Sequence, residues 1–132
     1  MKTKYNFLTI PIAIISIIYW FFNQNLEQPK HTSSKKHNEK YYQTKLCSQL
    51  GGKMEYRLRD ATRVDCITNK YAIEVDWAKK WAEGIGQALY YSIRTKKRPA
   101  VALIVGTKDK KYIKRLEQVA HKLHIKIFLI NK

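Results

Sequence analysis

Two carboxylates, Asp65 and Glu74, stand nine residues apart in a segment whose apolar and polar residues alternate as in β-strands. Carboxylates bind hard divalent cations such as Mg²⁺, which take oxygen ligands. A bound cation lowers the pKa of water and activates it for attack on a phosphodiester. The residues that follow have helical periodicity and carry further polar side chains suited to such a site: Lys80, Glu83, Gln87 and Tyr91. The pattern indicates metal-dependent phosphodiester hydrolysis, although the same elements also occur in proteins without catalysis.

The two acids are expected on neighbouring strands, residues 63–68 and 71–75, joined by a two-residue turn. If these strands pair, Asp65 and Glu74 converge on one ion. The main-chain carbonyl of Val75 is a natural third ligand, because hard cations accept carbonyl oxygens as well as carboxylates. The sequence therefore predicts a Mg²⁺ or Mn²⁺ site between these strands.

Residues 77–94 are long and periodic enough to predict one helix. At 100° per residue its polar side chains form a narrow stripe, and Asp76 just before the segment falls on the same line. Lys80 lies on that stripe and is the predicted cation beside the developing phosphate charge. The adjoining face is apolar and should pack on the sheet: Trp77, Trp81, Ile85, Ala88 and Leu89.

The rest of the chain predicts an α/β domain with a mixed sheet flanked by helices. The expected order is helix 41–50, strands 54–58, 63–68 and 71–75, helix 77–94, strand 100–105, helix 108–123 and strand 125–130. The early strands can pair as hairpins, whereas the later strands are separated by helices and should add in parallel. The expected architecture is thus αβββαβαβ.

The chain is strongly basic: among its 132 residues are 26 lysines and arginines against 10 acids, for a formal net charge of +16. This excess favours a polyanionic partner, with nucleic acid ahead of an anionic membrane surface. Such charge is also common in small proteins that bind neither selectively. The basic side chains around the long helix are predicted to bind phosphate: Arg63, Arg94, Lys96, Lys97 and Arg98. The cluster at 108–115 is interpreted as a solvated helix face.

The first 40 residues are not expected to belong to the folded domain. Residues 1–22 contain a long apolar run and predict a single-pass signal-anchor, since no small-x-small cleavage site follows it. Residues 23–40 are polar and predict a flexible tether, so the domain is placed at 41–132. The lysines of the tether favour a cytoplasmic domain.

The two cysteines favour the opposite orientation. Cys47 and Cys66 are the only cysteines, and a pair beside an export-like segment is typical of one disulfide outside the cytoplasm. Two separate buried thiols remain the alternative. The side of the membrane on which the domain lies is thus left open.

Four motifs resemble those of the PD-(D/E)xK nuclease superfamily, and more narrowly those of a group of small bacterial proteins of unassigned role. They are Gly51-Gly52-Lys53-Met54-Glu55, Arg63-Val64-Asp65-Cys66, Ala72-Ile73-Glu74-Val75-Asp76, and the segment from Lys80 to Tyr91. The resemblance covers roughly residues 46–104. It implies a restriction-endonuclease-like core and a DNA substrate, with DNA more expected than RNA.

By this resemblance Asp65 and Glu74 would hold the metal, with Glu55 as an additional ligand from the first motif. Gln87 and Tyr91 would match a Gln-x-x-x-Tyr pair that fixes the metal site and the substrate strand. One departure concerns the usual lysine two residues after the second acid, where this chain has Asp76.

Two interpretations of that departure follow. Lys80 can replace the missing lysine from the following helix, as the resemblance allows, with Glu83 orienting water; the protein is then a membrane-tethered nuclease. Alternatively, Asp76 marks a catalytically inactive nuclease-fold module that binds nucleic acid or an envelope partner.

Overall fold

The computed structural model describes residues 37–132, which form the predicted order of helix, three strands, helix, strand, helix and strand. The elements are α2 (Glu39–Gln49), β1 (Lys53–Arg57), β2 (Arg63–Ile67), β3 (Tyr71–Trp77), the 3₁₀ turn η1 (Ala78–Lys80), α3 (Trp81–Thr95), β4 (Arg98–Val105), α4 (Lys110–Leu123) and β5 (Lys126–Asn131). The predicted anchor at 1–22 lies outside the described residues, as does the predicted tether up to residue 36. Within 37–132, no helix is both long enough and apolar enough to cross a membrane.

The five strands form one mixed sheet in the order β1-β2-β3-β4-β5. The first three strands are antiparallel neighbours, and β4 and β5 add in parallel. This confirms the predicted mixed sheet. Its cause is the chain length between strands: short turns permit only antiparallel return, whereas α3 and α4 each carry the chain back to the same end of the sheet.

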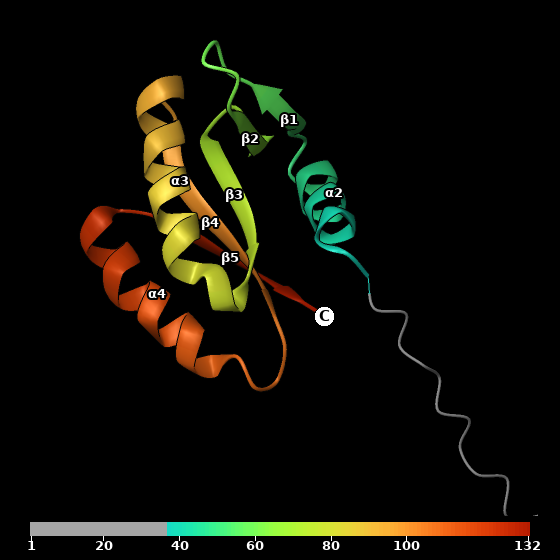
Figure 1. Ribbon diagram of the computed structural model, residues 1–132, viewed down its shortest axis with the longest axis vertical. Helices are drawn as coiled ribbons and strands as arrows, with labels where there is room; N and C mark the ends of the chain where they lie inside the picture. The colour runs from blue at the N-terminus through green and yellow to red at the C-terminus, as the bar shows by residue number, and fades with distance from the viewer. Residues whose placement is uncertain (1–36) are drawn as a thin grey trace, which may run out of the picture. The chain divides into compact units, whose positions relative to one another are not determined.

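Helices cover both faces of the sheet (Figure 1). Helices α3 and α4 pack on one face through a core that includes Val101, Leu103 and Leu116. Helix α2 lies on the other face, where Leu46 and Cys47 join a core with Ile73. The interior strand β4 is apolar along its whole buried length because both of its faces are covered.

The predicted long helix begins later than expected, and this changes the setting of two residues. Strand β3 continues to Trp77, whose backbone pairs with Ile104 of β4, and a 3₁₀ turn separates it from α3. The Trp77 ring packs edge-on against Tyr42 of α2, with ring centroids 5.8 Å apart. The prediction that Trp77 belongs to the apolar face of the long helix was therefore wrong, and Asp76 is a strand residue rather than part of the helical stripe.

Helix α2 begins at Glu39, two residues before the predicted start of the folded domain. The side chain of Asn38 accepts a hydrogen bond from the main-chain N–H of Tyr41 at 3.0 Å, which caps the helix. Glu39 adds a negative charge in the first turn, where the helix dipole favours it. Residues 38–40, predicted as tether, thus belong to the cap and first turn of α2.

Candidate active site

Asp65 lies where β2 and β3 separate. The paired residues of these strands are Cys66 with Ile73 and Ile67 with Ala72, and a continued ladder would place Asp65 opposite Glu74. Instead, Oδ2 of Asp65 accepts a hydrogen bond from the main-chain N–H of Val75 at 2.9 Å. The Asp65 side chain thus takes the place of a main-chain carbonyl as the acceptor for the Val75 N–H. This hydrogen bond holds the Asp65 carboxylate between β2 and β3.

Glu74 and Asp76 extend this acidic group along β3. Both side chains are buried, with 6% and 3% of their surfaces exposed. Within residues 37–132, Oε2 of Glu74 and Oδ2 of Asp76 are buried oxygen atoms without a hydrogen-bond partner. A buried carboxylate oxygen without a partner is costly, because it has lost water and gained nothing in return. A bound water, a proton on the carboxyl group or a cation would satisfy these two atoms.

The pKa values of the three acids reflect the same burial. Burial, as the largest cause, and the nearby charges of Asp65 and Asp76 together raise the pKa of Glu74 to about 9. Burial also raises the pKa of Asp65 to about 6, although the hydrogen bond from the Val75 N–H opposes the change. Asp76 has a pKa of about 6, raised by burial and opposed by Lys80. Neighbouring carboxyls with raised pKa values are typical of functional sites.

Helix α2 contributes two residues that the sequence did not reveal as part of the site. The amide nitrogen of Gln43 donates to Oε1 of Glu55 at 2.9 Å, to the main-chain oxygen of Asp65 at 2.9 Å, and lies 3.3 Å from Oδ1 of Asp65. The negative charge of Glu39 raises the pKa values of the strand acids. The sequence feature that could have revealed Gln43 is its position on the apolar face of the helix, beside Tyr42 and one turn before Cys47.

Glu55, predicted as an additional metal ligand, is held by other side chains. It accepts the hydrogen bond from Gln43, and its oxygens lie 3.3 Å from Lys40 and 3.0 Å from Arg63. The Gln43 hydrogen bond is the main reason why its pKa is lowered. Glu55 thus reaches Asp65 through Gln43, and Arg63, predicted to bind nucleic acid, forms an ion pair beside the site.

Lys80, predicted as the cation beside the phosphate, lies at the end of η1 and contacts Asp76 of the acid group. Its ammonium nitrogen is 3.5 Å from Oδ1 of Asp76 and 3.9 Å from Oε2 of Glu83. The Asp76 charge is the main reason why the pKa of Lys80 is raised. A Cβ on Gly84 of α3 would lie 3.3 Å from Cγ1 of Val101 and 3.6 Å from Oδ2 of Asp76, so the helix lies close to β4 and to this acid at Gly84.

Gln87 and Tyr91 lie one turn apart on α3, and the Tyr91 hydroxyl donates to Oε1 of Gln87 at 3.5 Å, which is a weak contact. Tyr91 is 6% exposed and packs with Val64 and Ala72. Burial raises its pKa to about 12, and the charge of Glu74 contributes. Tyr91 thus faces the acid-bearing strands, and Gln87 lies one helical turn before it.

The remaining predicted phosphate-binding residues make their contacts away from Asp65, Glu74 and Asp76. Arg94 is 3.6 Å from Asp60, which also accepts a hydrogen bond from Tyr90. Lys96 ends α3 in a left-handed conformation, and the Lys97 ammonium donates to the main-chain oxygen of Asn69 at 2.9 Å. Arg98 opens β4, where it pairs with Tyr71, whereas Glu74 pairs with Val101 further along. These residues therefore gather at the opposite end of the sheet.

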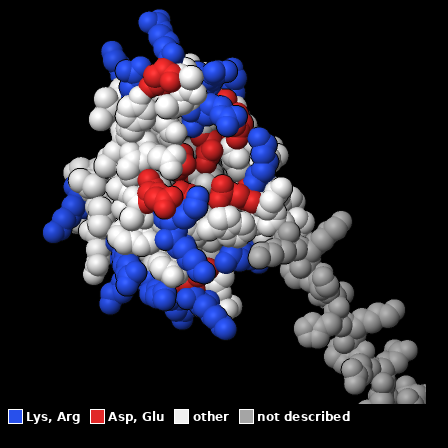
Figure 2. Space-filling model, in the orientation of Figure 1, with Lys and Arg blue, Asp and Glu red and all other residues white. Residues whose placement is uncertain are grey.

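The oxygen atoms of the site are of the kind that a divalent cation takes as ligands. In the part of the chain that the structure describes, no three His, Cys, Asp or Glu side chains meet as a metal-binding group. The predicted ligands were Asp65, Glu74 and the Val75 carbonyl, with Glu55 as a possible further acid, and the structure does not bring Asp65, Glu74 and Glu55 together as such a group. The unpaired oxygens of Glu74 and Asp76 are the observation that fits a cation. Figure 2 shows acidic side chains gathered in the middle of one face, with lysine and arginine side chains around them.

A disulfide joins α2 to β2 beside this site. Cys47 and Cys66 are bonded and fully buried, so the structure has the disulfide and not two separate thiols. A Cβ on Gly52 would lie 2.6 Å from the sulfur of Cys66 and 2.9 Å from that of Cys47, so only glycine fits there. Because Cys47 follows Gln43 by one helical turn and Cys66 follows Asp65 directly, the bond fixes the helix that carries Gln43 against the strand that carries Asp65.

Comparison with known proteins gives one informative match. The chain is 38% identical over 80 residues to a KilA-N domain-containing protein of Acanthamoeba polyphaga mimivirus. The match covers 59% of this chain and 32% of the viral protein, so the chain spans about a third of that relative. No protein-family model and no solved structure match the chain.

Proposed function

We propose that this protein is a divalent-cation-dependent phosphodiester hydrolase that acts on DNA and is tethered to a membrane by its N-terminal segment. The observation that carries the proposal is the acid group at the β2–β3 separation, where two buried carboxylate oxygens have no partner. A cation would satisfy them without protonation. Buried acid groups are commonly neutralised by cationic side chains, and among residues 37–132 Lys80 forms ion pairs with Asp76 and Glu83 but not with Asp65 or Glu74.

In this proposal Asp65 and Glu74 would hold the cation together with the carbonyl of Val75. When bound, Mg²⁺ or Mn²⁺ would supply Lewis-acid polarisation of the phosphate and a lowered pKa for bound water. Gln43 and the Val75 N–H orient the Asp65 carboxylate through the hydrogen bonds described above. Lys80 places positive charge at the edge of the acid group, where negative charge would develop on the phosphate oxygens.

The nucleic-acid partner is supported by charge and by the viral relative. A net charge of +16 favours a polyanion, and phosphate contacts would give affinity without sequence choice. KilA-N is a DNA-binding domain, so the similarity to the viral protein supports DNA as the partner in this proposal.

A second candidate function is a binding module without turnover. The observation that favours it is the position of Asp76, where the resembled superfamily has lysine. Asp76 also draws the Lys80 ammonium to itself at 3.5 Å, so part of the positive charge that would serve the phosphate is neutralised. In that case the acid group would bind a cation and a nucleic-acid strand without hydrolysis.

Cleavage of DNA by the purified full-length protein separates these candidates. Linear DNA, circular DNA and single-stranded RNA are each incubated with Mg²⁺, Mn²⁺ or EDTA, with Asp65→Asn as the test variant. Glu117→Gln, which alters an exposed acid on α4, is the matched control. Metal-dependent cleavage that is lost only in Asp65→Asn supports the enzyme. Absence of cleavage with every substrate, while salt-sensitive binding persists, would replace it with the binding module.

A further inference from the structure

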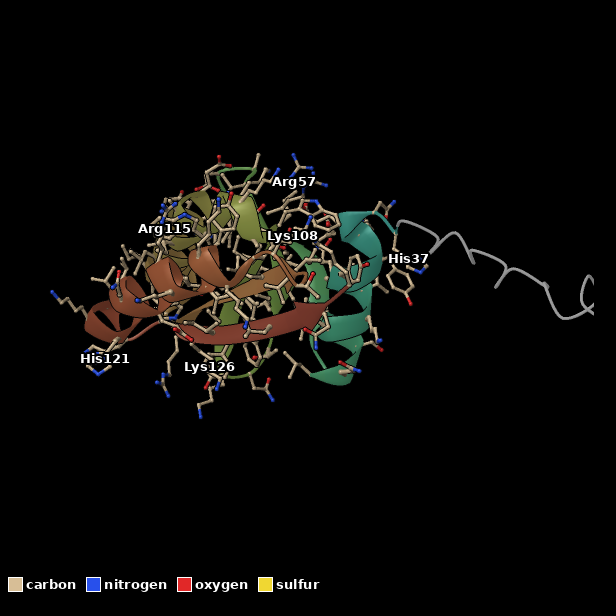
Figure 3. All side chains as sticks on the ribbon, turned by 90° about the horizontal axis from the view of Figure 1, so that it is seen from below. His37, Arg57, Lys108, Arg115, His121 and Lys126 are labelled. Carbon is tan, nitrogen blue, oxygen red and sulfur yellow. A yellow bond between two sulfur atoms is a disulfide. The ribbon has the colours of Figure 1, made fainter. Side chains whose placement is uncertain are left out.

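A second polar surface lies at the other end of the sheet from the acids. Tyr71 of β3 and Phe128 of β5 meet edge-to-face there, with ring centroids 5.9 Å apart. Both are only partly buried and lie on the face that also carries α2. Lys126 projects from the start of β5 on the side away from α4 (Figure 3). We call this surface, with the two hollows described below, the basic end of the sheet.

Positive side chains lie close to these rings. The Lys70 ammonium is 5.4 Å from the Tyr71 ring centroid, and the Arg98 guanidinium is 5.7 Å from the same ring. The Lys126 ammonium is 5.5 Å from the Phe128 ring centroid. Three neighbouring strands therefore present rings and cations together, which is the side-chain composition of surfaces that stack bases and pair with phosphates.

Two shallow hollows that share part of their lining lie at this end of the sheet, and Tyr71 lines one of them. One, of about 260 Å³, is lined by Leu50, Gly51, Thr68, Asn69, Lys70 and Tyr71. The other, of about 290 Å³, shares Gly51, Thr68 and Asn69 with it and adds further side chains, among them Lys53, Tyr56 and Lys97. Of the described residues that line the two hollows, none is acidic.

The basic end is separate from the acid group. Glu74 and Asp76 follow Tyr71 by three and five residues on β3, which corresponds to about 10 to 17 Å along the strand. By strand alternation, both acids also point to the opposite face from Tyr71. A ligand at the basic end can therefore bind without contact with the acids.

We infer that the basic end of the sheet binds single-stranded nucleic acid, with bases against Tyr71 and neighbouring rings and phosphates against Lys70, Arg98 and Lys126. In a duplex the bases are stacked on one another and do not reach such rings, whereas an unpaired base does. A lipid surface would require protruding apolar side chains, and here the rings are half-buried among cations. The inference deepens the proposed function, because it names single strands as the form of substrate that the protein holds, but binding at this end requires no hydrolysis.

The first test measures binding of the full-length protein to a fluorescent 20-nucleotide oligothymidylate by anisotropy, in EDTA and about 100 mM salt. The variant Lys70→Gln/Arg98→Gln/Lys126→Gln should bind about 10- to 100-fold more weakly. Its plot of log affinity against log salt should be less steep by about 2, because three phosphate contacts are lost. The matched variant Lys110→Gln/Lys111→Gln/Lys114→Gln removes the same charge from α4 and should bind less than about threefold more weakly. Equal losses in both variants would overturn the inference.

The second test concerns the rings. Tyr71→Leu should weaken binding of the oligothymidylate about fivefold or more, since stacking is lost, while Tyr71→Phe should bind like the wild type. Melting temperatures of both variants show whether the fold is retained. If Tyr71→Leu does not fold, the charge variants still decide. A duplex that binds as tightly as the single strand would contradict the inference.

Two further comparisons distinguish a nucleic-acid site from a lipid contact, and binding from hydrolysis. If the lysine and arginine variant loses affinity for vesicles with about 30% anionic lipid but not for the oligothymidylate, the surface is a lipid contact and the inference fails. If the selective loss of oligothymidylate binding is observed but no substrate is cleaved, the inference stands and the proposed hydrolase fails. If a substrate is cleaved but the two charge variants lose affinity for the oligothymidylate equally, the proposed hydrolase stands and the inference fails.

Discussion

The two ends of strand β3 contrast in charge and in setting. Around Glu74 and Asp76, carboxylates are buried with fewer partners than they need. Around Tyr71, cations are exposed and lie over aromatic rings. Burial of unpaired charge costs stability and is retained only where something else depends on it, whereas exposed cations cost little. The acid end therefore lowers the stability of the fold, whereas the basic end does not.

The largest expected effect is a loss of DNA turnover when the acid end alone is altered. Glu74→Gln should lower turnover of DNA at least about 100-fold, because removal of one ligand charge weakens the cation that activates water. Affinity for oligothymidylate in EDTA should change less than about threefold, because the basic end is untouched. Cleavage rates and anisotropy measure the two outcomes, with Glu117→Gln as the control. Unchanged turnover would remove Glu74 from the proposed mechanism.

The next prediction concerns the disulfide beside the acid end. Cys47→Ala/Cys66→Ala should lower the free energy of unfolding by about 2–4 kcal/mol, because the bond closes a loop between residues 19 positions apart. The variant should also lower turnover in the temperature range where it stays folded, because α2 holds Gln43 against Asp65. Denaturant unfolding and cleavage rates are measured with and without a reductant. A reductant should cause the same losses of stability and turnover only if it reaches the buried sulfurs. The prediction is therefore judged on the Cys47→Ala/Cys66→Ala variant.

The pH dependence of stability sharpens the contrast further. The pKa of Glu74 is about 9 in the folded protein, raised by burial from an ordinary value of 4.5. The proton is thus bound more tightly by the folded state, so this contribution to stability is complete below about pH 4.5 and is lost as the pH rises towards 9. In metal-free buffer the wild type should lose stability between about pH 6.5 and 9, above the range in which Asp65 and Asp76 titrate.

Glu74→Gln provides the control for this pH effect. The amide cannot ionise, so the variant should be more stable than the wild type at about pH 8 by about 1–3 kcal/mol and should show a flatter profile. Mg²⁺ should stabilise the wild type more than the variant, because a ligand that binds only the folded state raises its stability. Thermal melts at several pH values, with and without Mg²⁺, measure these differences. Parallel profiles for the two proteins would contradict the raised pKa.

The smallest predicted effect concerns Gln43. Gln43→Met keeps the approximate size of the side chain but removes the donor to Glu55 and Asp65, and should destabilise the protein by about 1–2 kcal/mol. Gln49→Met, at an exposed position of the same helix, should change stability by less than about 0.5 kcal/mol. Denaturant unfolding compares the pair. Similar losses in both variants would show that the buried hydrogen bonds of Gln43 contribute nothing specific.

Much of the fold could be predicted because it follows from local patterns. Alternation marked β1, β2 and β3, the continuous apolar run marked β4, and period-3.6 segments marked the helices. The start of α3 could not be predicted in this way. Residues 77–80 continue the helical pattern in sequence, but Trp77 is held in the strand by its contact with Tyr42, which lies 35 positions earlier in the chain.

The acid group was predictable only in part, for the same reason. Asp65 and Glu74 belong to neighbouring strands joined by a short turn, so their proximity could be inferred from spacing. Gln43 and Glu39 join them from a helix more than 20 residues away, and nothing local specifies which face of α2 meets β2. The phosphate-binding role predicted for Arg63 likewise did not anticipate its ion pair with Glu55.

The sequence by itself determined the order of elements, the mixed sheet and the basic character of the chain, since hydrophobic periodicity and composition act locally or additively. The tertiary structure decided which charges are buried, that Cys47 bonds to Cys66, and that acids and cations occupy opposite ends of β3. The physical reason is that burial, pKa and ion pairing depend on what other parts of the chain bring to the same place.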